Sequence, residues 1–120
     1  MYQRILVATD GSKLSTKAVN SAIELAALAG AELIALKVIP RYPQSYFEGS
    51  VPLSAEDVAR VEQKWSDDGR SVVDAVKAAG EAQGVKVKAI LAKSDVVSDA
   101  LIAAAKKHKA DLIVMASHGR

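Results

Sequence analysis

The chain has 120 residues, 50% of them hydrophobic and 25% charged, with a formal net charge of +2, which predicts one globular domain spanning 1–120. The weak charge and the 4% aromatic content give no basis for nucleic-acid binding, and the absence of cysteine excludes disulfides, thiolate catalysis and cysteine-ligated zinc. No apolar stretch reaches the length of a membrane span and no signal peptide opens the chain, so we expect no membrane partner and a cytoplasmic location.

The chain opens with the pattern of a strand followed by a helix. An apolar run at 5–9 predicts a buried strand. Apolar residues at helical spacing then predict a helix over 13–29. Ser12 or Ser15 can cap the start of this helix, and Gly30 fits the position just past its end.

A second strand and a long loop follow. The strand is predicted over 33–39 and is stopped by Pro40. The loop 40–53 contains all three prolines of the chain. We expect it to be mobile, and to act as a lid or a subunit contact rather than as core. Three of the five aromatic residues lie in it: Tyr42, Tyr46 and Phe47.

A long amphipathic helix is predicted between Ser54 and Gly84. Gly69 and Gly80 lie inside it and are expected to weaken it locally. Its apolar stripe consists of Val58, Val61, Trp65, Val72, Val76 and Ala79.

The last third predicts a strand over 85–91, a helix over about 95–108 and a strand over 112–116. The strand at 85–91 alternates valine or alanine with lysine, so one of its faces meets water, as at a sheet edge. The other strands are continuous apolar runs, which is typical of strands covered on both faces.

Alternating strands and helices predict an α/β fold with an open parallel sheet and helices on both faces. Right-handed crossovers favour the strand order 3-2-1-4. In that order the chain changes direction between strands one and four, and the crevice at their carboxyl ends is where such sheets bind ligands. The turns Asp10-Gly11-Ser12 and Ser117-His118-Gly119 both fall there.

Asp10 is the leading candidate for a binding residue. A carboxylate at the end of the first strand can accept hydrogen bonds from a ribose, or it can simply cap the turn. The single glycine, Gly11, excludes both the three-glycine dinucleotide fingerprint and the Walker A loop. A response-regulator magnesium site needs a second acid beside Asp10, and Thr9 is not one. Two histidines without a metal-ligand pattern predict no metal site.

Three segments, in order and at the right spacing, resemble the universal stress protein family. Residues 5–12 (ILVATDGS) resemble its opening strand and turn, and 35–39 (ALKVI) resemble its second strand. Residues 110–120 (ADLIVMASHGR) resemble its fourth strand and the start of its nucleotide loop. This resemblance implies a Rossmann-like fold of the adenine nucleotide alpha hydrolase type.

The resemblance also implies a function: ATP bound with magnesium, no catalysis, a role in the stress response, and a homodimer. Asp10 would hold the ribose, the Val38 backbone the adenine, and Gly119 the phosphates. Ala116 replaces the first glycine of the family's phosphate loop, which puts a methyl group at a point of close approach. The implied nucleotide-binding residues are Ala8, Thr9, Asp10, Val38, Met115, Ala116, Ser117, His118 and Gly119.

Two alternatives remain open. The protein could be an interaction module of this family that does not bind ATP, or a slow nucleotide hydrolase. Catalysis by His118 lacks a visible nucleophile or orienting carboxylate. The rest of the family's phosphate loop, its fourth helix and its fifth strand have no counterpart in the sequence. An apolar fourth strand is a poor natural edge, so we expect the native polypeptide to continue beyond Arg120.

Overall fold

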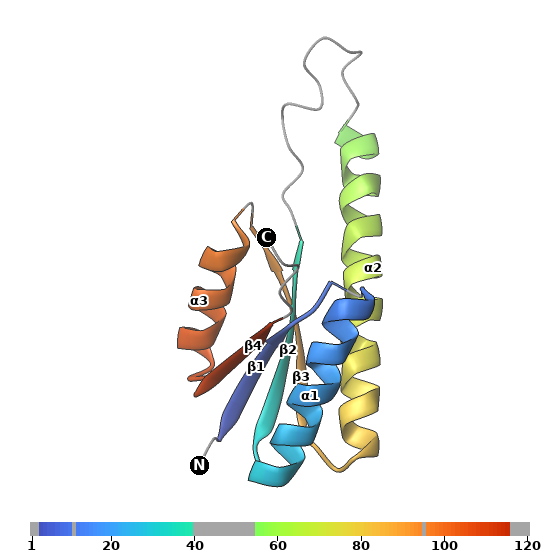
Figure 1. Ribbon diagram of the computed structural model, residues 1–120. Helices are drawn as coiled ribbons and strands as arrows, with labels where there is room; N and C mark the ends of the chain where they lie inside the picture. Colours follow the sequence, from blue (N-terminus) through green and yellow to red (C-terminus); the bar gives the residue numbers. More distant parts are fainter. Residues whose placement is uncertain (1–2, 11, 40–54, 95, 116–120) are drawn as a thin grey trace.

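Four parallel strands form one sheet in the order β3-β2-β1-β4 (Figure 1). The computed structural model describes residues 3–10, 12–39, 55–94 and 96–115. The predicted strand order and the edge position of the third strand are therefore confirmed. The strands are β1 (Arg4–Ala8), β2 (Glu32–Ile39), β3 (Val87–Lys93) and β4 (Leu112–Met115).

Three helices cover the sheet on both faces. Helices α1 and α2 lie against one face and α3 lies against the other (Figure 1). At 1.5 Å per residue α2 is about 42 Å long, whereas the eight residues of β2 span about 26 Å. The first turns of α2 therefore project past the sheet (Figure 1). The helices are α1 (Lys13–Ala29), α2 (Ala55–Ala82) and α3 (Val97–Lys107).

The ends of α1 agree with the sequence prediction. The cap is Ser12 rather than Ser15, because the Ser12 hydroxyl accepts the backbone N–H of Ser15 at 3.1 Å. Gly30 ends the helix in the left-handed region, with φ 66°.

The third strand and third helix each begin two residues later than predicted. The N–H of Val85 donates to the Gly80 carbonyl at 2.9 Å, so this residue closes the turn after α2 and the ladder with β2 starts at Val87. Val96 caps α3 in an extended conformation, which places the first helical residue at Val97.

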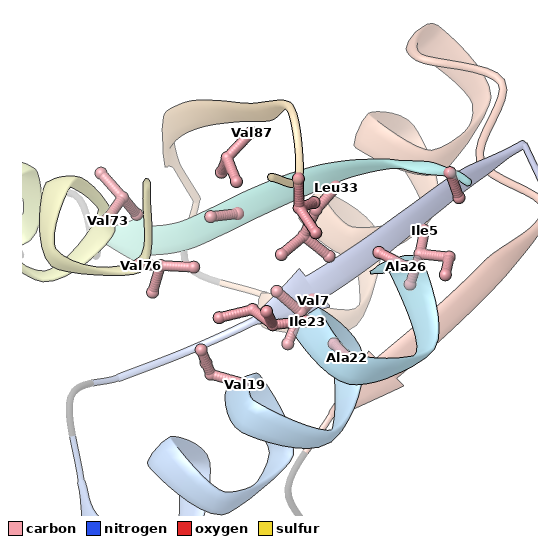
Figure 2. Close-up of a cluster of buried hydrophobic side chains, with 13 residues drawn as sticks. Ile5, Val7, Val19, Ala22, Ile23, Ala26, Leu33, Val73, Val76 and Val87 are labelled. Carbon is pink, nitrogen blue, oxygen red and sulfur yellow. The ribbon is translucent and has the colours of Figure 1, made fainter. Parts of the chain in front are cut away.

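The larger of two apolar clusters fills the space between the sheet and helices α1 and α2 (Figure 2). Strand residues such as Ile5 and Leu33 are fully buried there, and Ile23 of α1 and Val73 of α2 pack onto them. Val73 replaces part of the predicted stripe of α2, since Ala79 is exposed. Helix α2 is oriented so that Val73 and Val76 face the sheet.

Gly69 and Gly80 are packing positions, a role that the sequence did not predict. The helix is continuous through both, and both are buried. A Cβ at Gly80 would overlap the side chain of Val87, and one at Gly69 would lie 3.0 Å from Leu91 Cδ2. Only a residue without a side chain lets α2 approach β3 this closely.

The second cluster lies between the sheet and α3, and it leaves β4 half covered. Leu101 of α3 packs over Leu6 and Leu36. Leu112 and Val114 face α1, but Ile113 and Met115 point to the other face and are 41% and 54% exposed. The expectation that both faces of the fourth strand are covered is therefore wrong for the described residues, because α3 packs over β1 and β2.

None of the helices described here is both long and apolar enough to cross a membrane. Within the same ranges, histidine, aspartate and glutamate side chains do not gather in groups of three that could hold a metal ion.

Candidate functional site

A pocket of about 270 Å³ opens at the carboxyl edge of the sheet, where the strand order changes direction. It brings together residues from β1, β2 and β4 that are far apart in sequence. The predicted site residues that line it are Ala8, Thr9, Asp10, Val38 and Met115. The other predicted residues, Ala116, Ser117, His118 and Gly119, lie outside the described residues, as does the predicted mobile loop 40–53.

Strands of unequal length give this pocket a backbone donor and acceptor. Alternate residues of β2 direct their N–H and C=O groups to β1, as Leu36 does when its carbonyl accepts the Thr9 N–H at 3.0 Å. The N–H and C=O groups of Val38 point to the β1 side, like those of Leu36. However, the pairing between β1 and β2 ends at Ala8 and Leu36. The peptide groups of Val38 on the β1 side therefore face the pocket.

Asp10 is held in a turn at the rim. Its Oδ1 atom accepts the backbone N–H of Ser12 at 2.8 Å, which is the turn-capping role considered from the sequence. The side chain is exposed and lines the pocket. The capping bond orients the carboxylate, so the capping role and a ligand-binding role are compatible in one residue.

Hydroxyl groups form the wall where α1 begins. Thr9 and Ser15 are 7% and 2% exposed, and their hydroxyl oxygens lie 3.1 Å apart. The Ser15 hydroxyl donates to the Ser12 carbonyl at 3.0 Å. Because these buried hydroxyls bond to one another, they fix the start of α1 relative to the end of β1.

A sequence model of the universal stress protein family matches residues 1–120. The chain belongs to the universal stress protein family.

Three similar proteins match almost the whole length of this chain. A universal stress protein of Methanocaldococcus jannaschii is 32% identical over 122 residues, covering 100% of this chain and 67% of the relative. A solved universal stress family structure from Burkholderia pseudomallei has a TM-score of 0.82 at 32% identity, covering 98% of this chain and 83% of that one. A universal stress protein solved in complex with cAMP has a TM-score of 0.70 at 25% identity, covering 94% and 75%.

Sequence reasoning about this universal stress protein domain missed part of the pocket. Ser15, Leu36, Lys37 and Val97 also line it. Lys37 carried a usable signal, because it is a charged residue inside an otherwise apolar strand. Val97 carried none, since its place depends on how α3 meets the end of the sheet.

A larger pocket, of about 430 Å³, lies at the amino edge, so size alone does not identify the site. It is bordered by the turns after α1 and α2, including Gly30 and Gly84. In this fold class ligands bind at the carboxyl edge. That rule, together with the Asp10 turn, makes the smaller pocket the candidate site.

Proposed function

We propose that this domain binds an adenine nucleotide, ATP with magnesium, in the pocket at the carboxyl edge. The observation that carries the proposal is the Val38 backbone, whose N–H and C=O face the pocket beyond the end of β1. A donor and an acceptor on one strand match the edge of an adenine ring, which offers both. The family relative solved with cAMP supports adenine nucleotides as the ligand class.

Asp10 is the proposed ribose anchor. Its carboxylate stands at the rim, oriented by the Ser12 N–H, and can accept hydrogen bonds from sugar hydroxyls. In the proposal the phosphates extend toward Gly119.

The proposed role is binding without catalysis, as a cytoplasmic homodimer that serves the stress response. Sedimentation velocity of the protein, with and without ATP, tests the dimer. A nucleotide-independent interaction module is the alternative if ATP does not bind.

Calorimetric titration with Mg-ATP tests the nucleotide proposal. Asp10→Asn keeps the side-chain oxygen that caps the turn but loses the charge. We expect binding to weaken by about 1–3 kcal/mol, which is roughly tenfold to a hundredfold. Asp99→Asn, an equal charge change on α3 outside this pocket, should leave the affinity unchanged.

The outcomes separate the alternatives. Absence of ATP binding by the unaltered protein would favour the interaction module, with Ala116 in place of glycine as the suspected cause. Equal affinities of the unaltered protein and Asp10→Asn would leave nucleotide binding intact and reduce Asp10 to a turn cap.

A further inference from the structure

A second pocket lies on the α2 side of the carboxyl edge. Its volume is about 260 Å³. It combines an aromatic ring, two carboxylates and one amine with apolar walls. The residues that define it are Asp10, Lys37, Ile39, Trp65, Asp68 and Val72.

The pocket exists because of how α2 meets β2. Trp65, Asp68 and Val72 follow one another at helical spacing and form one stripe of α2. Lys37 and Ile39 have the parity of Leu33, whose side chain belongs to the α2-facing cluster. Gly69 brings the helix down onto the sheet, so a hollow remains beside this contact, where β2 ends.

The lining chemistry favours one class of ligand. Trp65, the single tryptophan of the chain, is half-buried and supplies a ring surface for stacking or for a cation. The carboxylates of Asp10 and Asp68 accept hydrogen bonds, and Lys37 donates them. Two negative charges against one positive charge disfavour a phosphate and favour a donor-rich group.

We propose that this pocket binds a planar aromatic ligand that carries an amino or amidinium group. The ring lies on the Trp65 indole, and the nitrogen donors bond to Asp68 and Asp10. Asp68 is the main partner, because Asp10 Oδ1 already accepts the Ser12 N–H. The pocket volume of about 260 Å³ has room for a ligand of one or two rings.

This proposal does not rest on nucleotide binding, although Asp10 and Lys37 line both pockets. Trp65, Asp68 and Val72 line the second pocket and take no part in the first. The experiment therefore uses the protein without nucleotide, and its failure would leave the ATP proposal untouched.

Titration with benzamidine, benzamide and benzoate, followed by Trp65 fluorescence, tests the ligand class. These probes share a ring and differ in charge. We expect saturable quenching by benzamidine, weaker binding of benzamide, and binding of benzoate at least about tenfold weaker than benzamidine. Equal binding of benzoate and benzamidine, or absence of saturation, would overturn the proposal.

Matched variants locate the probe. Asp68→Asn should weaken benzamidine about tenfold. Asp67→Asn makes the same charge change one residue away, where the carboxylate accepts a hydrogen bond from Gln63 at 2.8 Å, and should change binding less than twofold. Equal effects of the two variants would refute a specific site.

A variant that fills the pocket gives a second readout. Val72→Phe should abolish benzamidine binding while circular dichroism shows a retained fold. If that variant does not fold, the comparison of Asp68→Asn with Asp67→Asn decides alone. Val97→Ala alters only the nucleotide pocket and should leave benzamidine binding unchanged. Loss of binding in Val97→Ala would assign the probe to the other pocket and overturn the proposal.

Discussion

The backbone polar groups at the two edges of the sheet have different surroundings. At the amino edge the backbone closes on itself: the Asp111 carboxylate accepts the N–H groups of Gln3 and Arg4 at 2.7 and 2.9 Å, and the Glu32 N–H donates to Gln3. At the carboxyl edge β2 continues past β1, and Val38 faces a pocket. At the amino edge these polar groups bond within the protein, whereas at the carboxyl edge those of Val38 face a pocket.

This difference explains why we propose the binding site at the carboxyl edge, although the pocket at the amino edge is larger. Polar groups that are already bonded within the protein have little to offer a ligand. The comparison predicts that changes at the amino edge alter stability and leave nucleotide affinity unchanged. Changes at the carboxyl edge should alter nucleotide affinity and leave stability unchanged.

The largest expected effect is on stability, at Gly80 near the amino edge. Alanine normally stabilises a helix by about 1 kcal/mol relative to glycine. Here the added methyl group would overlap Val87, so Gly80→Ala should destabilise the fold by about 1–3 kcal/mol. Urea unfolding measures the change, and calorimetry should find the affinity for ATP unaltered. An increase in stability would show that α2 does not approach β3 this closely.

The next effect is on binding, at Val38. Val38→Pro removes an N–H that faces the pocket rather than the ladder with β3, so the strand can accept it. We expect ATP to bind about tenfold more weakly, because an acceptor on the adenine loses its partner. Val38→Ala, which keeps the N–H, is the control. Equal affinities of these two variants would contradict adenine recognition by the backbone.

The smallest effect is a pH dependence at the amino edge. Hydrogen bonds from the backbone of Arg4 and Gln3 lower the pKa of Asp111 from its usual 3.8. The stabilisation is therefore complete above the unfolded pKa and is lost as pH falls through the lower folded value. The unaltered protein should have a larger free energy of unfolding than Asp111→Asn above this window. The difference between the two proteins should shrink as the pH is lowered across it. NMR titration of the Asp111 carboxyl should give a pKa below 3.8, and a value above it would contradict the assignment.

The candidate site was partly predictable from sequence for a definite reason. Strand parity and the switch in strand order place Asp10 and Val38 at one edge, because both follow from local pattern and chain connectivity. The contribution of Ser15 and Val97 was not predictable, since it depends on how separate helices pack against the sheet.

The sequence by itself determined the parallel sheet, its order and the bounds of α1, because hydrophobic periodicity and capping residues act over a few neighbours. Only the tertiary structure decided the roles of Gly69 and Gly80, which sequence reasoning treated as weak points. Their role depends on Leu91 and Val87, which belong to a different element. The same reason explains Trp65, which was expected in the core stripe and instead lines a pocket, because the rotation of α2 on the sheet is set by packing between distant residues.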